Sequence, residues 1–327
     1  MKKAKGVCFL MLMSAFILGA KAESDHYPIK PVRLIYPFSA GGGGDLVART
    51  LSAELSKDLK QSFIVDNRAG GNGNIGTDIV SRATPDGYTV LLTTNATIVI
   101  NPQLFTKSVT YDPVKGFSPV SLVVSQPFVL VLHPSVAAKT VPELMALAKA
   151  NPGALNYASS GAGGGAHLAG EMLKTFAHID ITHVPFKGSA PALTALMSGE
   201  VQFMFVAILA AKPMIEQNRL RAIAVSTAKR NPVFSQLPAV SEFAGLENFE
   251  SDLWYGFLAP AKTPTLVIQT LYQSIRAALD RASIKTRFES TGTVLVGSSP
   301  LEFSQTIAKD LARWGKVIKT SKVSADY

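Results

Sequence analysis

Cysteine is nearly absent from this chain, since Cys8 is the only one among 327 residues. It lies within an N-terminal segment that is typical of a removable leader, so the mature chain would have no thiol. Without thiols the mature protein cannot form disulfides, use a cysteine nucleophile or bind a metal through cysteine.

Charged residues are also scarce, at 17%, whereas hydrophobic residues make up 47% of the chain. This is enough apolar material for a large core, and the length suggests about two domains. The formal net charge is +9, of which four charges come from leader lysines, so the mature chain carries +5. Its lysines and arginines are scattered among acids instead of clustering with aromatics, which argues against a nucleic-acid partner.

Several catalytic motifs are missing as well. The sequence has no phosphate-loop pattern G-x-x-x-x-G-K-[ST], no H-E-x-x-H zinc motif and no G-x-S-x-G nucleophile elbow. Its five histidines include no pair at ligand spacing beside a carboxylate. These absences argue against ATP hydrolysis and against a metal site, and no cofactor is indicated.

The first 22 residues have the pattern of a secretory signal peptide. Lys2, Lys3 and Lys5 precede an apolar run over 7–20, and 20–22 offers a small-x-small cleavage pattern. The run is shorter than the roughly 20 apolar residues that a membrane helix needs. We therefore expect export with cleavage, not a membrane anchor.

Strand and helix patterns alternate along the chain. The apolar segment "VRLIY" (32–36) precedes a helix with Val47, Leu51 and Leu55 on one face, and "FIVDN" (63–67) follows. This order predicts an α/β protein with a parallel sheet. A second set of such units includes "FVLVL" (128–132), and the tail ends in two long helices that begin near 263 and 299.

The economical arrangement of these elements is two α/β lobes with a cleft between them. We expect lobe 1 to comprise residues 23–125 and 253–327, and lobe 2 to comprise residues 126–252. The chain would then cross between the lobes twice, and the crossings would act as hinges.

Each predicted lobe carries a glycine-rich loop between a strand and a helix. Gly41 to Gly44 follow the first strand, with Asp45 placed to cap the next helix, and "SSGAGGGAHLAGE" (159–171) repeats the arrangement. Glycine lets a ligand touch the backbone, and the free N–H groups of a helix N-terminus attract anions. Two such loops facing each other would hold a carboxylate or phosphate, in which case Gly42→Val or Gly163→Val should block the cleft with little loss of folding. The alternative is that the glycines only make tight turns.

Two enzymatic interpretations of the second loop compete with anion binding. Gly161 to Ala166 fits the dinucleotide pattern G-x-G-x-x-A, but the following acid, Asp180, precedes a strand where it should end one. Ser159 and Ser160 with His167 suggest a secreted serine hydrolase, although alanine replaces the first glycine of the elbow. For His167 we expect the commoner role of tying the loop to the helix.

Seven segments, taken together and in order, carry a family resemblance. They are "YPIKPVRLIYPFSAGGGGD" (27–45), "NRAGGNGNIGTDIVSRATPDGYTVLL" (67–92), "INPQLF" (100–105), "NYASSGAGGGAHLAGE" (156–171), "HVPFKGSAPALTALMSGEV" (183–201), "LRAIAVSTAKRNP" (220–232) and "LWYGFLAPAKTP" (253–264). The chain resembles the Bug-type periplasmic solute receptors of tripartite tricarboxylate transporters, over essentially its whole mature length.

This resemblance implies a type II periplasmic binding protein fold that closes on a small carboxylated solute and delivers it to a membrane permease. It implies a monomeric periplasmic receptor with no enzymatic activity. Carried over, the first pincer is 37–45, the second is 159–167, and 184–188 borders the same cleft. The candidate ligand-binding residues are Phe38, Ser39, Ala40, Gly41, Gly42, Gly43, Asp45, Asn95, Ser159, Ser160, Gly161, Ala162, Gly163, His167, Phe186 and Lys187.

The sequence also departs from the family pattern. Gly44 and Gly164 stand where relatives often carry a small hydroxyl residue or alanine, and Val206 stands where many have an aspartate. Without an acid at 206, a ligand with an ammonium end would leave a costly unpaired cation. We therefore expect a carboxylate whose other end is neutral or anionic, not an amino acid. Whether the receptor serves transport or a membrane signalling partner stays open at this level.

Overall fold

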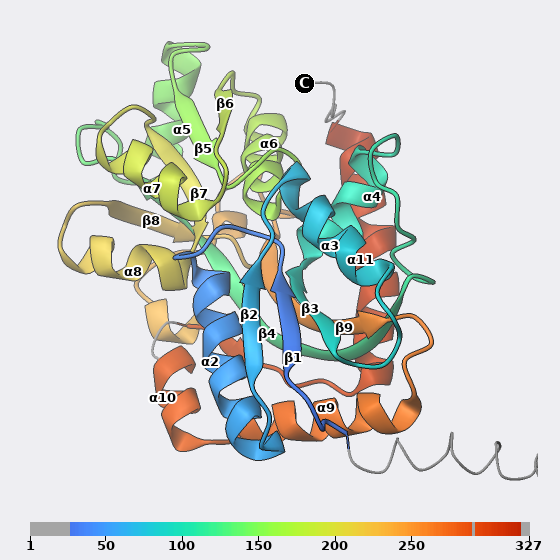
Figure 1. Ribbon diagram of the computed structural model, residues 1–327. Coiled ribbons are helices and arrows are strands. Elements are labelled where there is room, and N and C mark those ends of the chain that lie inside the picture. The colour runs from blue at the N-terminus through green and yellow to red at the C-terminus, as the bar shows by residue number, and fades with distance from the viewer. Residues whose placement is uncertain (1–26, 290–291, 322–327) are drawn as a thin grey trace, which may run out of the picture.

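The computed structural model describes residues 27–289 and 292–321, so the predicted signal peptide lies outside the described part. Figure 1 shows an α/β protein in which helices cover a strongly twisted sheet. None of the helices in the described ranges is long and apolar enough to span a bilayer.

The first part of the chain forms a parallel unit, as its pattern predicts. Its elements are β1 (Val32–Tyr36), α2 (Gly43–Leu59), β2 (Phe63–Asn67), the 3-10 turn η1 (Gly71–Gly73), α3 (Asn74–Ser81), β3 (Thr89–Thr94), the π-helix η2 (Ala96–Ile100) and α4 (Asn101–Leu104). β1 pairs in parallel with both β2 and β3. Val47, Leu51 and Leu55 of α2 are buried, which confirms the predicted apolar face.

The middle of the chain builds a second α/β unit. Its elements are α5 (Val141–Ala150), β5 (Asn156–Ser159), α6 (Gly165–Ala177), β6 (Thr182–Pro185), α7 (Ser189–Met197), β7 (Phe203–Ala207), α8 (Ile208–Glu216) and β8 (Arg221–Val225). β5 pairs in parallel with β6 and β7. The carboxyl ends of β5, β6 and β7 therefore meet at one edge, and the helices α6, α7 and α8 begin there.

One long strand joins the two units. β4 (Phe117–Leu132) pairs with β9 (Asp252–Pro260) along its first two thirds, and with β7 and β8 along its last third. The sequence predicted a separate strand only over 128–132, because Pro127 interrupts the apolar run. In the fold β4 continues through Pro127, which lies opposite Asp252. The predicted lobe boundaries at 125/126 and 252/253 thus fall inside β4 and at the start of β9, and as boundaries they stay a prediction.

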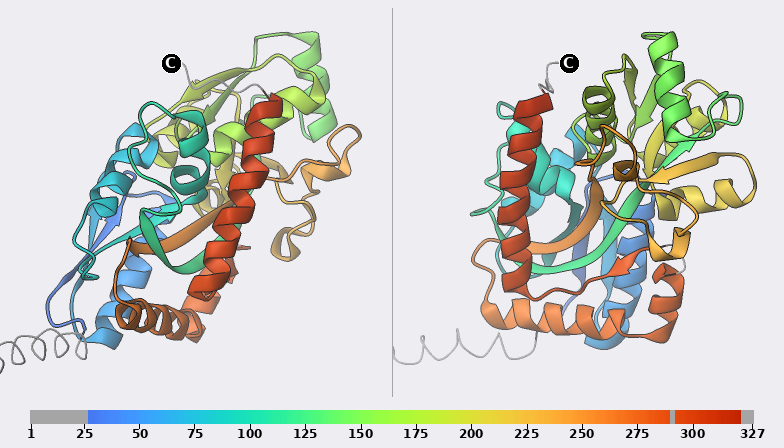
Figure 2. Two further views of the ribbon diagram at one scale, coloured as in Figure 1. Left: turned by 90° about the vertical axis from the view of Figure 1, so that its right-hand side faces the viewer. Right: turned by 180° about the vertical axis from the view of Figure 1, so that it is seen from behind.

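The tail contains more elements than the two predicted helices. After the 3-10 turns η3 (Pro232–Phe234) and η4 (Val240–Glu242) and β9 come α9 (Thr265–Leu279), α10 (Ala282–Glu289), β10 (Val294–Leu295) and α11 (Pro300–Ser321). The predicted capping box of α11 is confirmed, since the Glu302 amide donates to Ser299 Oγ and the Ser299 amide donates to the Glu302 carboxylate. α11 packs against β4, η2 and α6, so it supports both units from behind (Figure 2).

The contact between α11 and the sheet depends on a glycine. Phe303 of α11 is fully buried and meets Trp254 of β9 edge to face, with 5.3 Å between the ring centroids. A Cβ atom on Gly256 of β9 would overlap the Phe303 ring. Only glycine therefore lets the helix approach this close to β9.

We predict that Gly256→Ala lowers the free energy of unfolding by about 1–3 kcal/mol, because overpacking displaces the Phe303 ring. Urea unfolding followed by circular dichroism would measure the loss. The double variant Gly256→Ala with Phe303→Leu is the matched control, and it should lose less than the sum of the two single variants. Additive losses would contradict this account of the contact.

Candidate functional site

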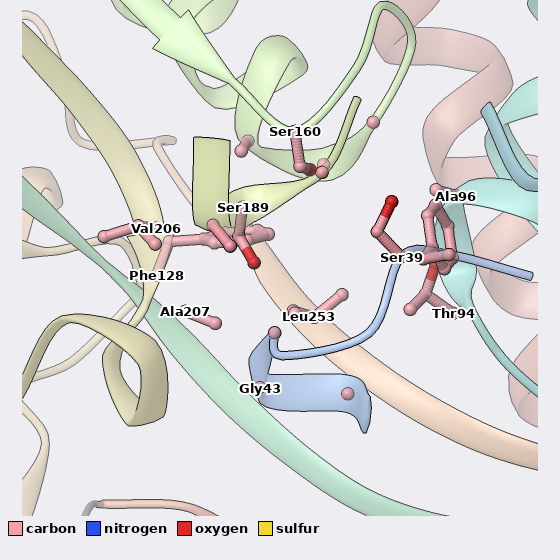
Figure 3. A pocket seen from close by; sticks show the side chains of 18 of the residues that line it. Ser39, Gly43, Thr94, Ala96, Phe128, Ser160, Ser189, Val206, Ala207 and Leu253 are labelled. Atoms are coloured by element: carbon pink, nitrogen blue, oxygen red, sulfur yellow. The ribbon is translucent and has the colours of Figure 1, made fainter. Parts of the chain in front are cut away.

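A pocket lies where the two units face each other across β4 and β9 (Figure 3). Its volume is about 760 Å³, which includes space that is open to solvent. Its walls come from the strand ends and helix starts of both units. The lining residues are Tyr36, Phe38, Ser39, Ala40, Gly42, Gly43, Gly44, Asn72, Thr94, Ala96, Phe128, Ser160, Gly164, Gly165, Ala166, Gly188, Ser189, Ala190, Met204, Phe205, Val206, Ala207, Leu253 and Tyr255.

The first glycine loop forms one wall of this pocket. α2 begins at Gly43, and Gly42 is its N-cap residue without any side-chain hydrogen bond to the helix. The first N–H groups of α2 therefore have no partner from a capping side chain, and the helix end is electrostatically positive. A Cβ on Gly44 would overlap Tyr36 and Tyr255, whereas a Cβ on Gly42 would lie 2.9 Å from Ser189 Oγ on the opposite wall. Close contact with both walls thus explains why side chains are excluded here.

Asp45 stabilises this loop from inside and is not the N-cap that the sequence suggested. The side chain is buried and accepts hydrogen bonds from the Gly41 amide, Arg49 Nε and Asn67 Nδ2, at 3.1, 2.9 and 3.0 Å. Asn67 Nδ2 also donates to the Phe38 carbonyl oxygen. Burial would raise the pKa of Asp45, but the three hydrogen bonds outweigh it and lower the pKa below its usual value. Asp45 is therefore an anion that fixes the loop.

We predict that Asp45→Ala lowers the free energy of unfolding by about 1–3 kcal/mol, because it removes the acceptor of the Gly41 amide and one of the two acceptors of Asn67 Nδ2. Arg49→Ala is the matched control, since it removes only an exposed partner and should cost less than about 1 kcal/mol. Chemical denaturation of both variants at neutral pH would compare them. Equal losses in the two variants would show that Asp45 contributes through its ion pair with Arg49 and not through its hydrogen bonds to the loop.

The second glycine loop forms the facing wall. α6 begins at Gly165 with Gly164 as N-cap, and both residues line the pocket together with Ser160. Gly161 and Gly163 have φ of 149° and 76°, which only glycine adopts easily. They turn the loop toward the first unit, because a Cβ on Gly161 would lie 2.6 Å from Asn72 Oδ1. The structure thus brings the two predicted loops to one pocket.

His167 ties this loop to α6, as expected. Its Nδ1 accepts a hydrogen bond from the Gly163 amide at 2.8 Å, and its ring stacks on His183 with 3.9 Å between centroids. His183 Nε2 in turn lies 2.6 Å from Ser159 Oγ. Burial lowers the pKa of His167 to about 4, and burial together with His167 lowers the pKa of His183 to about 3. Both rings are neutral near pH 7 and lie behind the pocket wall.

The sixteen candidate residues fall into three groups. Phe38, Ser39, Ala40, Gly42, Gly43 and Ser160 line the pocket. Gly41, Asp45, Ser159, Gly161, Ala162, Gly163 and His167 belong to the same two loops but are not among the lining residues. Asn95, Phe186 and Lys187 lie beside the pocket, where Asn95 Nδ2 donates to the Asp252 carbonyl oxygen and the Lys187 carbonyl oxygen accepts from Ser39 Oγ.

A third wall was only partly expected from the sequence: of the segment 184–188, expected to border the cleft, Gly188 lines the pocket, and so does Val206, whereas the rest of this wall was not among the candidates. The N-terminus of α7 contributes Gly188, Ser189 and Ala190, and the end of β7 contributes 204–207. The available signal was the rule that ligands meet the carboxyl ends of parallel strands, applied to β6 and β7 as well as to β5. Short apolar strand ends carry no glycine-rich motif, so this wall was harder to find than the two loops.

Contacts between the two units lie beside the pocket. Ser39 Oγ donates to the Lys187 carbonyl oxygen at 3.1 Å. Asn72, whose Nδ2 is held by Asn101 Oδ1 at 2.9 Å, faces Gly161. Loops far apart in sequence therefore meet beside the cavity and connect the two units there.

The electrostatic character of the pocket comes from dipoles, because none of its lining residues carries a charged side chain. The helices α2, α6 and α7 all begin at the pocket, and hydroxyl groups come from Ser39, Ser160 and Ser189. Burial raises the pKa of Tyr36 and Tyr255 well above the usual value, so both phenols keep their protons. Donors without counter-charges favour a small anion. In the ranges that the structure describes, no group of three or more His, Cys, Asp or Glu residues is placed to hold a metal ion.

Comparison with known proteins matches the chain to one family model, described as the receptor of the tripartite tricarboxylate transporter family, over residues 47–323. Among curated proteins, BugT of Bordetella pertussis is 32% identical over 302 residues, which cover 92% of each chain. A protein in the tcbD-tcbE intergenic region of Pseudomonas sp. strain P51 is 33% identical over 92% of this chain and 89% of its own.

Solved structures agree with these matches. An R. palustris protein with adipate has 36% identity and a TM-score of 0.88, over 91% of this chain and 99% of that one. The periplasmic binding protein BugD has 31% identity and a TM-score of 0.86, over 91% and 99%. MatC from Rhodopseudomonas palustris, with bound malate, has 31% identity and a TM-score of 0.84, over 89% and 100%.

Proposed function

Because this chain belongs to the receptor family of tripartite tricarboxylate transporters, and is therefore a carboxylate-binding solute receptor and not an enzyme, we propose that the pocket between its two units captures the solute. The single observation that carries this proposal is that two glycine loops, each opening a helix, face one pocket that has no charged side chain. Family membership gives the class of solute, and the pocket supports the proposed binding place.

The carboxylate is held between the N-terminal ends of α2 and α6. Amides of 42–44 and 165–166 supply donors from opposite walls, and Ser160 adds a hydroxyl group. Asp45 and His167 support the two loops from behind, because each accepts a hydrogen bond from a backbone amide of its loop. The ligand bridges both walls, so binding energy offsets the cost of ordering the two units in the closed arrangement.

The relatives are periplasmic binding proteins, and this chain begins with the signal-peptide pattern at 1–22. We propose that the mature protein is exported, works as a monomer in the periplasm and delivers its solute to the membrane subunits of a tripartite tricarboxylate transporter. A receptor that reports the solute to a membrane signalling partner would use the same pocket. Deleting the gene of this receptor and measuring solute uptake separates the two, because only the loss of a transport receptor lowers uptake.

Isothermal titration of the mature chain against mono-, di- and tricarboxylates tests the binding role. We expect saturable binding of at least one carboxylate, and a matching rise in the melting temperature, since a ligand at 100 times its Kd stabilises a protein by about 2.7 kcal/mol. The corresponding amides are the matched controls and should not bind, because they lack the negative charge. Absence of binding across the whole panel would reject the proposal.

A further inference from the structure

The two ends of the pocket differ in chemistry. Figure 3 shows Phe128, Val206 and Ala207 together on one side with Ser189 beside them, Ser39, Thr94 and Ala96 on the other side, and Leu253 between the two groups. We define the apolar wall as Phe128, Met204, Val206, Ala207 and Leu253, all of which line the pocket and are at most 9% exposed.

The apolar wall offers no side chain that could compensate a charge. Its five members have no hydrogen-bonding or ionic group except the thioether of Met204, which is a weak acceptor. The neighbouring lining residue Phe205 is apolar as well. The hydroxyl of Ser189 beside this wall is neutral, so a charged group placed here would lose its water without gaining a charged partner, whereas a hydrocarbon group would only lose unfavourable contact with water.

The opposite end is polar and still has free hydrogen-bonding capacity. Thr94 Oγ1 is buried and has no hydrogen-bond partner within the described part of the chain. Ser39 is half-buried beside it in the pocket wall. The Ser39 hydroxyl already donates to the Lys187 carbonyl oxygen, so Thr94 Oγ1 and the amides of the two glycine loops are the groups that favour a carboxylate at this end.

From this asymmetry we propose that the solute is a single-headed carboxylate, with a hydrocarbon tail that lies against the apolar wall. This proposal rests on the proposed function, because it assigns the orientation and class of the ligand in the same pocket. It excludes an ammonium end, and it also excludes a second carboxylate, which the sequence had left open.

One feature of the fold opposes this assignment. α8 begins at Ile208, directly after the apolar wall, and the amides of its first turn could donate hydrogen bonds to a second carboxylate. α8 has only nine residues and contains Pro213, so it has fewer aligned peptide dipoles than α2 with 17 residues or α6 with 13. In this proposal the cost of dehydrating a second charge at the apolar wall outweighs the attraction of the first-turn amides of α8.

Three ligands of equal length test the proposal by isothermal titration: hexanoate, adipate and 6-aminohexanoate. They share one carboxylate and differ only at the far end, which is a methyl group, a carboxylate or an ammonium. We expect hexanoate to bind at least tenfold more tightly than either of the others. Acetate, which lacks the tail, should bind at least tenfold more weakly than hexanoate.

The outcomes separate this inference from the proposed function. If adipate binds as tightly as hexanoate or more tightly, the single-headed assignment is wrong while the carboxylate receptor stands. If 6-aminohexanoate does so, the assignment is likewise wrong. If none of the three ligands binds and no other carboxylate of the panel binds, the proposed function and the single-headed assignment are both wrong. If only other carboxylates bind, the assignment stands when monocarboxylates with a tail are preferred. It is wrong when di- or tricarboxylates are preferred.

A pair of variants at Leu253 provides an independent measurement. Leu253→Lys places a cation in the apolar wall and should shift the preference toward adipate by tenfold or more, because the second carboxylate then gains a partner. Leu253→Met is the matched control of similar length without charge, and it should keep the preference for hexanoate. An unchanged preference in folded Leu253→Lys, verified by circular dichroism, would show that the tail does not reach this wall.

Discussion

Gly42→Val should weaken carboxylate binding by at least about 100-fold, which corresponds to roughly 2.8 kcal/mol. Gly42 has φ of −86° and ψ of 171°, an extended conformation that valine adopts without strain. Its Cβ would lie 2.9 Å from Ser189 Oγ, and its methyl groups would enter the space in front of the first amides of α2. The variant should therefore fold but close poorly, and titration with the best ligand of the panel would measure the loss.

Gly42→Ala is the graded control for this effect, and it should lose less affinity than Gly42→Val because it adds no γ-methyl groups. The melting temperature of the ligand-free variants should stay close to that of the parent protein. The sequence suggested Gly163→Val as an equivalent test, but the structure makes it unsuitable. Gly163 has φ of 76° and its Cβ would lie 2.6 Å from the Phe105 ring, so valine would impair folding there. Wild-type affinity of folded Gly42→Val would refute the role of this loop.

Lowering the pH should destabilise the protein at pH values well above the pKa range of its carboxylates, because His167 and His183 are buried in the neutral form. Their pKa values are lowered to about 4 and about 3, whereas the unfolded chain has histidines near 6.5. The unfolded state therefore binds protons first as the pH falls below 6.5, and stability is lost until the folded-state pKa values are reached. Between pH 6.5 and pH 4 the loss is on the order of 3 to 5 kcal/mol for the pair.

Urea unfolding at several pH values between 7 and 4 would measure this slope. His183→Gln removes one of the two protons taken up on unfolding, so its stability should depend less steeply on pH. His178→Asn is the matched control, because His178 is exposed and asparagine tolerates its φ of 51°. The stability of His178→Asn should depend on pH between 7 and 4 as steeply as that of the parent protein. Identical slopes for His183→Gln and the parent protein would contradict the burial argument.

The α/β class and most elements could be predicted because they depend on local patterns. The apolar face of α2, the strands around it and the capping box of α11 each follow from residue spacing within one segment. β4 could not be predicted as one strand, since Pro127 is a local break that pairing with β9 overrides. α10 and β10 were missed because their short segments gain order from packing against α9 and β4.

The candidate site was predicted as two loops but not as a complete pocket. Glycine clusters mark a backbone that something approaches closely, so the loops at 41–44 and 161–165 could be found without a structure. What approaches them could not be found, because the partners come from distant segments: Ser189 faces Gly42, Asn72 faces Gly161, and Tyr36 and Tyr255 face Gly44. His167 was expected to tie its loop to the helix, and its hydrogen bond confirms this, whereas Asp45 was expected to cap α2 and only its hydrogen bonds showed that it supports the loop from behind.

The sequence by itself determined most of the elements, the two glycine-rich helix starts and the resemblance to a receptor family, because each is a property of residues close in the chain. The tertiary structure alone decided that β4 and β9 carry both units, that α7 adds a third wall and that one end of the pocket is apolar. The physical reason is that a binding pocket is defined by distances between groups far apart in sequence. Long-range strand pairing and side-chain packing set those distances, and local propensity does not encode them.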